Sequence, residues 1–231
     1  MDMTIPQDTK QFFNSLCDNI FKQHNAYLEK HNEFYDYYDS PLLESERECM
    51  GMVAVSVDKS SDIMLSEVPF SKKESILYRG KNVQEDKNRR VDLWCSYGET
   101  SCFIEVKHGH YCLTNGTQNK LTQNLIDKFK AMIKQIRDID KIPDAKHWGE
   151  HTVSIGLMPI VGYYNKTKGF DEKFTSQSIV DELQKQIHGR LHVDILHQTW
   201  ETPPHIIESW KHQFPYATKF ITIIGVVRVH K

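Results

Sequence analysis

Three residues between positions 89 and 113 are of types that handle metal ions and phosphate groups. Glu105 and Lys107 lie two apart in a segment where apolar and polar residues alternate, so in a β-strand they share one face. Asp92 holds the matching position in the alternating segment before it. If that segment is the neighbouring strand, two carboxylates and an ammonium group meet at one place. Such a cluster is costly to build unless a cation or an anionic substrate compensates its charges.

The two alternating segments, residues 91–96 and 102–107, flank a short turn at 97–100 that contains glycine. Period-two alternation on both sides of such a turn predicts a β-hairpin. Cys95 and Cys102 fall on inward-facing positions and are expected to be small core residues. The hairpin is therefore the element that must position the acidic and basic groups.

This spacing resembles that of the PD-(D/E)XK nuclease superfamily, which includes many restriction endonucleases and Holliday-junction resolvases. The family has an Asp on one strand and Glu/Asp-x-Lys on the next, and here Asp92 and the tripeptide 105–107 match those positions. Val91 stands where the family often has proline. The resemblance covers residues 42–165. It implies an α/β fold with a restriction endonuclease-like αβββαβ core, in which helices flank a mixed central sheet.

The resemblance also implies a metal-dependent nuclease that hydrolyses phosphodiester bonds, with DNA as the expected substrate. Asp92 and Glu105 would hold Mg²⁺ or Mn²⁺, and the backbone carbonyl of Val106 would be a further ligand. Oxygen ligands of this kind suit Mg²⁺, which takes its remaining ligands from water and phosphate. Lys107 would orient the attacking water, help to deprotonate it, and stabilise the developing negative charge.

Glu46 interrupts the apolar stripe of a predicted helix over residues 42–57. In resolvase-like members of the superfamily, a Glu on the helix before the hairpin often supplies a metal ligand. Glu46 is the expected counterpart, with Glu44 and Glu48 as competing assignments. The alternative is a boundary residue whose carboxylate points to water.

Substrate contacts are expected near the start of the helix that follows the hairpin, where Gln118, Lys120 and Gln123 are candidates for phosphate binding. Basic residues also form two groups, each of which would either neutralise phosphates or be ordinary solvated surface. They are Arg79, Lys81, Lys87, Arg89 and Arg90 before the hairpin, and Lys120, Lys128, Lys130, Lys134 and Arg137 after it.

Two simpler interpretations compete with a metal site in the hairpin. Asp, Glu and Lys on one strand face are commonly a solvated surface with cross-strand ion pairs. His108 and His110 follow the hairpin at a spacing that offers no third or fourth zinc ligand, and the chain has no His-Glu-x-x-His motif. We expect these histidines to be turn or groove residues.

Periodicity predicts the remaining elements. Helices are expected at 8–39 (as one or two helices), 42–57, 118–139, 174–188 and 204–214. Strands are expected at 62–70, 152–164, 191–198 and 219–229 in addition to the hairpin, with 71–90 as a long, substrate-facing connection. From residue 42 to residue 164 the order of the expected elements is αβββαβ. This order follows from periodicity alone, without the acidic and basic residues.

The 231 residues fit a single domain with an N-terminal helical extension (1–40), a nuclease-like core (42–165) and a C-terminal αβ extension of the sheet (166–231). Five cysteines without C-x-x-C spacing, no secretory signal and no apolar run of about 20 residues predict a cytoplasmic protein that does not enter membranes.

A net charge of −2 does not indicate nucleic-acid binding by itself, although a local basic patch is sufficient for it.

Two classes of function remain: a metal-dependent nuclease, and a catalytically inactive nuclease-fold protein that binds nucleic acid or a protein partner. A small-molecule enzyme is disfavoured because the chain has no glycine-rich phosphate loop and no Gly-x-Ser-x-Gly elbow. A homodimer is expected if both strands of a duplex are cut.

Overall fold

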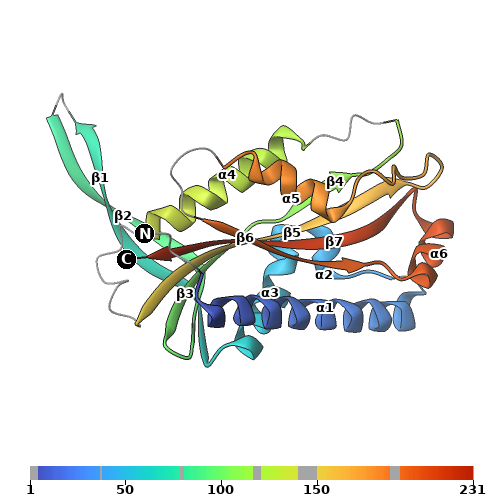
Figure 1. The fold of residues 1–231 in the computed structure, drawn as a ribbon, viewed down its shortest axis with the longest axis horizontal. Coiled ribbons are helices and arrows are strands. Elements are labelled where there is room, and N and C mark those ends of the chain that lie inside the picture. The colour runs from blue at the N-terminus through green and yellow to red at the C-terminus, as the bar shows by residue number, and fades with distance from the viewer. Residues whose placement is uncertain are drawn as a thin grey trace.

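A mixed sheet of seven strands, covered by helices on both faces, forms the centre of the protein (Figure 1). This agrees with the α/β class expected from the sequence. The computed structural model describes residues 5–36, 38–78, 81–116, 121–139, 150–187 and 193–230, with only the backbone described at 70–78, 81–89 and 211–213.

The sheet has the order β1-β2-β3-β5-β7-β6, and β4 pairs with β5 beyond the end of β3. The parallel pairs are β3 with β5 and β4 with β5, and the other pairs are antiparallel. The strands are β1 (Ile63–Tyr78), β2 (Lys81–Tyr97), β3 (Thr100–Val106), β4 (Gly109–Cys112), β5 (His151–Asn165), β6 (Asp194–Glu201) and β7 (Tyr216–His230).

Six helices are described, and several begin at polar caps. The Thr122 hydroxyl accepts a hydrogen bond from the Leu125 N–H at the start of α4, and Thr175 forms a capping box with Ser178 at the start of α5. The helices are α1 (Gln7–Tyr35), α2 (Pro41–Glu44), α3 (Glu46–Ser60), α4 (Gln123–Asp138), α5 (Ser176–Gln184) and α6 (Pro204–Gln213).

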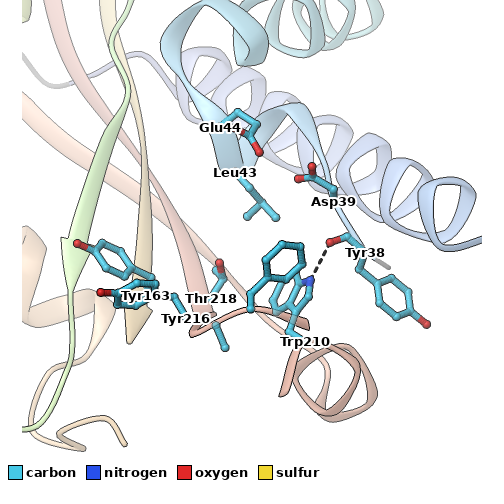
Figure 2. Close-up of a pocket in the computed structure, with 10 residues that line it drawn as sticks. Tyr38, Asp39, Leu43, Glu44, Tyr163, Trp210, Tyr216 and Thr218 are labelled. Atoms are coloured by element: carbon cyan, nitrogen blue, oxygen red, sulfur yellow. Dashed lines mark hydrogen bonds between the residues drawn. The ribbon is translucent and has the colours of Figure 1, made fainter. Parts of the chain in front are cut away.

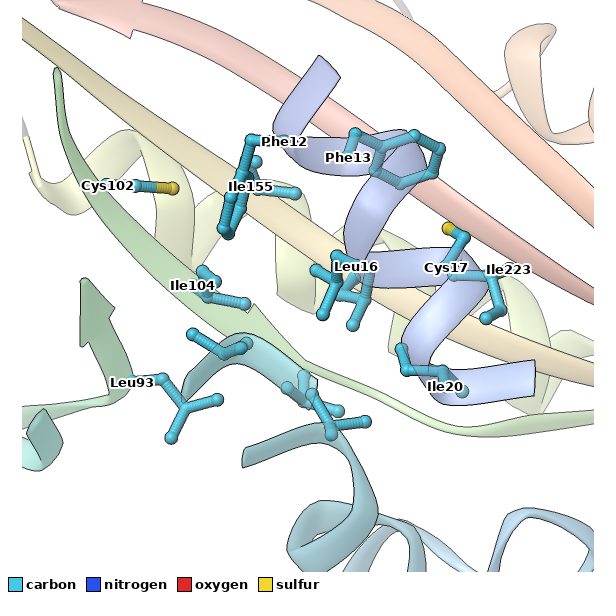
Figure 3. Packing of buried hydrophobic residues seen from close by; sticks show 14 of the residues in the cluster. Phe12, Phe13, Leu16, Cys17, Ile20, Leu93, Cys102, Ile104, Ile155 and Ile223 are labelled. Atoms are coloured by element: carbon cyan, nitrogen blue, oxygen red, sulfur yellow. The ribbon is translucent and has the colours of Figure 1, made fainter. Parts of the chain in front are cut away.

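Helix α1 covers the strands on one face of the sheet, together with α3 (Figure 3). Phe13 and Leu16 are fully buried there. Phe13 packs so closely on β7 that a Cβ atom at Gly225 would lie 2.4 Å from its ring, so the approach depends on glycine. The segment expected as an N-terminal extension is thus an integral part of the core.

The opposite face is covered mainly by α4 and α5, whose apolar residues pack on β5 and β7. The stripe of α4 predicted from the sequence is buried, including Phe129 and Met132. Met132 lies directly over Gly156, where an added Cβ would be 2.7 Å from the Met132 Cγ. This close contact brings α4 down onto the part of the sheet that carries Glu105, since Glu105 pairs with Gly156.

The expected connection over residues 71–90 is wrong, because this stretch continues β1 and β2 as a long antiparallel ribbon. Backbone pairing runs from Ile63 opposite Ser96 to Tyr78 opposite Lys81. The ribbon extends away from the body of the sheet (Figure 1). Residues 71–75 and 84–90 of this ribbon are all polar and lack apolar alternation, so periodicity did not reveal it.

Two further elements differ from the prediction. The helix expected over 42–57 is two helices, α2 and α3, because Ser45 adopts an extended conformation between them. The short strand β4 was not predicted. It continues along β5 after a break in regular strand structure at Lys107 and His108. Of the one or two helices expected over 8–39, the structure has one, α1.

The C-terminal strands extend the same sheet, as expected: β7 pairs with β5, and β6 pairs with β7. None of the helices in the described ranges is both long enough and apolar enough to cross a membrane.

We expect Phe13→Ala to lower the free energy of unfolding by about 3–5 kcal/mol, because it removes a buried ring and leaves a cavity over Gly225. Urea unfolding followed by circular dichroism measures this. Phe34→Ala is the matched control on the same helix: Phe34 is 73% exposed, so a change within about 0.5 kcal/mol is expected. Similar losses for both variants would contradict the packing described for α1.

Candidate active site at the divergence of two strands

The predicted hairpin is present and brings Asp92 and Glu105 together. Strands β2 and β3 pair in an antiparallel register in which Leu93 lies opposite Ile104. Residues directly opposite each other in such a pair point to the same face. Asp92 and Glu105 are the next residues on each strand, and their carboxyl groups are within hydrogen-bonding reach of each other.

The two strands diverge at this point. Pairing between β2 and β3 ends at Leu93. The residues of β2 that precede this point, 81–91, pair with β1 but not with β3. The Val106 N–H is therefore left without a backbone partner on β2, and the Asp92 carboxylate accepts its hydrogen bond at 2.8 Å. Asp92 thus completes the strand pairing with its side chain, which fixes the carboxylate beside Glu105.

The partner strand β1 is also irregular at this level. Glu67 lies between residues that pair with Leu93 and Val91, and its φ of 50° is in the left-handed region. A non-glycine residue in that region costs roughly 1–2 kcal/mol. The irregularity coincides with the point where the β1–β2 ribbon leaves the rest of the sheet.

Lys107 lies at the centre of the cluster. Its Nζ atom donates hydrogen bonds to Glu105 Oε1 at 3.0 Å, to the Val106 carbonyl at 2.8 Å and to Glu46 Oε1 at 3.3 Å. The side chains of Lys107 and Glu105 are 15% and 5% exposed. The structure therefore brings Asp92, Glu105 and Lys107 together, as predicted.

Glu46 reaches the cluster from the first residue of α3. Two histidines hold the chain just before it: His108 Nε2 donates to the Leu42 carbonyl at 3.0 Å, and His110 Nε2 donates to the Leu43 carbonyl at 3.1 Å. These bonds tie α2 to β4. The two histidines are thus positioning residues for the segment that delivers Glu46.

The competing carboxylates lie elsewhere. Glu44 lines a separate cavity with Asp39, and Glu48 is exposed on α3. Glu46 is therefore the helix residue that joins the hairpin groups.

Burial dominates the electrostatics of the two hairpin carboxyls. Burial, followed by repulsion from Asp92, raises the pKa of Glu105 to about 7. Burial also raises the pKa of Asp92, although the Val106 N–H and Lys107 oppose it. Burial lowers the pKa of Lys107, but Glu105, Glu46 and Asp92 outweigh it, and the net pKa is raised. Lys107 is thus an ammonium, while Glu105 changes between its protonated and ionised forms near neutral pH.

A divalent cation fits this set of residues. Fully ionised, the three carboxylates exceed the single ammonium by two negative charges. Lys107 Nζ already contacts two of the three expected metal ligands, Glu105 and the Val106 carbonyl. Among the described residues, no three His, Cys, Asp or Glu side chains are grouped to hold a metal. The expected set has two carboxylates and one carbonyl, so it is not a group of that kind.

The residues predicted to bind phosphate are not brought to this cluster in the described structure. Gln123 is exposed at the start of α4 and donates its side-chain N–H to Asp127 Oδ1 at 2.8 Å. Its amide is engaged within its own helix, so the expected contact is not supported. Gln118 and Lys120 lie outside the described residues.

Lys128 was predicted only as one of several basic residues, yet α4 places it beside the site. Its Nζ donates to the His108 carbonyl at 2.9 Å, and its charge affects Cys49 near the start of α3. The available sequence signal was its position on the polar side of the α4 stripe. Nothing local distinguished it from Lys130 or Lys134.

The chain matches no protein-family model and no curated protein sequence. The geometry and chemistry of the cluster therefore carry the functional argument.

The raised pKa of Glu105 predicts how stability depends on pH in metal-free protein. A carboxyl that binds its proton more tightly when folded stabilises the fold below its ordinary pKa of 4.5, and this contribution is lost as pH rises through about 7. The shift corresponds to at most about 3 kcal/mol. Glu105→Gln cannot ionise, so it should lose less stability than wild type between pH 5 and pH 8.

Urea unfolding at pH 5, 6, 7 and 8 in the presence of a chelator measures this difference. Glu172→Gln is the control, since Glu172 is exposed in a loop and the variant should keep the wild-type pH dependence. An unchanged pH dependence in Glu105→Gln would show that Glu105 is ionised throughout this range.

Proposed function

We propose that this protein is a metal-dependent nuclease with a restriction endonuclease-like core. The observation that carries the proposal is the meeting of Asp92, Glu105, Lys107 and Glu46 where β2 and β3 diverge. Satisfying the Val106 N–H requires only the Asp92 side chain, and a second buried carboxylate beside it adds repulsion that costs stability. A site that binds a divalent metal and a phosphodiester gives each of these groups a role.

The topology around the cluster supports the same proposal. Strands β1, β2 and β3 are antiparallel neighbours, α4 follows, and β5 lies parallel to β3. With α3 before β1, this is the αβββαβ order expected of the superfamily that the hairpin resembles.

In the proposed site, Asp92, Glu105 and the Val106 carbonyl hold Mg²⁺ or Mn²⁺. The chemistry that such a metal would supply is polarisation of the phosphodiester and a lower pKa of a bound water molecule. Lys107 has a raised pKa and three hydrogen-bond acceptors around it, so it is suited to orient water and to stabilise negative charge on the phosphate. Glu46 positions the Lys107 ammonium. Lys128 adds a second positive charge near the site.

We expect Asp92→Asn to lower metal affinity and DNA cleavage together, because it removes one charged oxygen ligand. The Asn amide oxygen still accepts the Val106 N–H bond, so the fold should be retained. Isothermal titration with Mn²⁺ and cleavage of supercoiled plasmid, linear duplex and branched DNA measure the two effects. Asp58→Asn, an exposed position on α3, is the matched control and should behave like wild type.

Lys107→Ala should retain metal binding while the cleavage rate falls by about 10²–10⁴, the usual effect of losing a positioned acid–base or charge-stabilising group. Lys130→Ala makes the same chemical change at an exposed position of α4 and should cut at the wild-type rate. Single-turnover assays with saturating Mg²⁺ separate rate from affinity.

The alternative function makes a different prediction for the same proteins. A nuclease-fold protein that only binds nucleic acid has no rate to lose, and Asp92→Asn would keep or increase DNA affinity by reducing repulsion of phosphate. If the wild-type protein cuts no DNA or RNA with Mg²⁺ or Mn²⁺ while it still binds them, the enzyme proposal fails.

A further inference from the structure

A cavity of about 270 Å³ lies between the start of α2, the end of α6 and the adjoining ends of β5 and β7 (Figure 2). Aromatic side chains form much of its wall, and two carboxyl groups lie at one side. The lining residues are Tyr38, Asp39, Leu43, Glu44, Tyr163, Trp210, Phe214, Tyr216, Ala217 and Thr218.

Contacts with neighbouring residues fix the positions of the aromatic side chains in the wall. Trp210 is 4% exposed, and its indole N–H donates to the Tyr38 carbonyl at 2.7 Å, which fixes the ring in place (Figure 2). Tyr163 and Tyr216 meet edge to face with ring centroids 5.7 Å apart. Tyr216 is 50% exposed, so part of this wall is open to solvent. Aromatic faces carry partial negative charge and attract organic cations.

The two carboxyl groups repel each other. Asp39 and Glu44 are close enough to share a side-chain hydrogen bond, and burial followed by the charge of Asp39 raises the pKa of Glu44. Glu48 also disfavours the charged form of Glu44, whereas His110 favours it. Within the described part of the chain, no lysine or arginine forms an ion pair with either carboxyl. A bound cation would relieve this repulsion.

We propose that this cavity binds an alkylammonium cation, that is, an amine or quaternary ammonium group carrying methyl or methylene groups. The charge would face Asp39 and Glu44, and the alkyl groups would contact Trp210 and Tyr216. A neutral apolar ligand would use the rings but leave the carboxyl pair unrelieved. A metal ion would use the carboxyls but gain little from the rings.

This site is separate from the cluster around Lys107. On β5, Leu157 lies beside Val106, whereas Tyr163 lies six residues further along, roughly 20 Å in an extended strand. Strands β4 and β5 and the segment that carries Glu44 and Glu46 run between the two sites, but none of the residues that line the cavity belongs to the cluster. The proposal therefore does not depend on nuclease activity.

Choline and 3,3-dimethyl-1-butanol provide a direct test, because the second molecule has the shape of choline without its charge. Binding is followed by NMR through the indole N–H resonance of Trp210, with assignment from Trp210→Phe. Choline should shift this resonance in a saturable manner and bind at least about fivefold more tightly than the neutral alcohol.

Two variants locate the bound cation. Glu44→Gln should weaken choline binding at least about threefold, and Tyr216→Ala, at a half-exposed position that the fold tolerates, should weaken it as well. Glu172→Gln, an equal change of charge away from the cavity, should not. Failure of choline to bind, equal binding of the neutral alcohol, or displacement of choline by equimolar Mg²⁺ would each overturn the proposal.

Discussion

The hydrogen bond from the Val106 N–H to the Asp92 carboxylate is the interaction on which the candidate site depends. Where β2 leaves β3, a backbone donor loses its strand partner, and a buried donor without a partner would cost about 1–3 kcal/mol. Asp92 satisfies it and is thereby held beside Glu105. The divergence of the strands thus creates both the need for a carboxylate and the space around it.

The groups around this bond are held by independent contacts from both faces of the sheet. Met132 of α4 packs over Gly156, the residue of β5 that pairs with Glu105. Burial and repulsion from Asp92 raise the pKa of Glu105. On the other side, His108 holds the Leu42 carbonyl, so that α3 begins with Glu46 against Lys107. The acidic groups are therefore preorganised by packing that does not involve them directly.

The short segment from Asp39 to Glu46 supplies carboxyl groups to two places in the structure. Glu44 joins Asp39 at the aromatic cavity, and two residues later Glu46 joins the cluster around Lys107. The extended conformation of Ser45 separates the two, because it ends α2 and starts α3 in a new direction. A single continuous helix would have placed these carboxylates differently.

The sequence by itself determined the hairpin, the buried stripe of α4 and the apolar strand β5, because their periodicity depends only on neighbouring residues. It also marked Asp92, Glu105 and Lys107, since strand alternation fixes which side chains share a face. Only the tertiary structure decided the β1–β2 ribbon, the small strand β4, and which of Glu44, Glu46 and Glu48 meets Lys107. The polar parts of β1 and β2 are stabilised by pairing with each other, and Glu46 meets Lys107 from 61 positions away in the sequence, so neither leaves a local pattern.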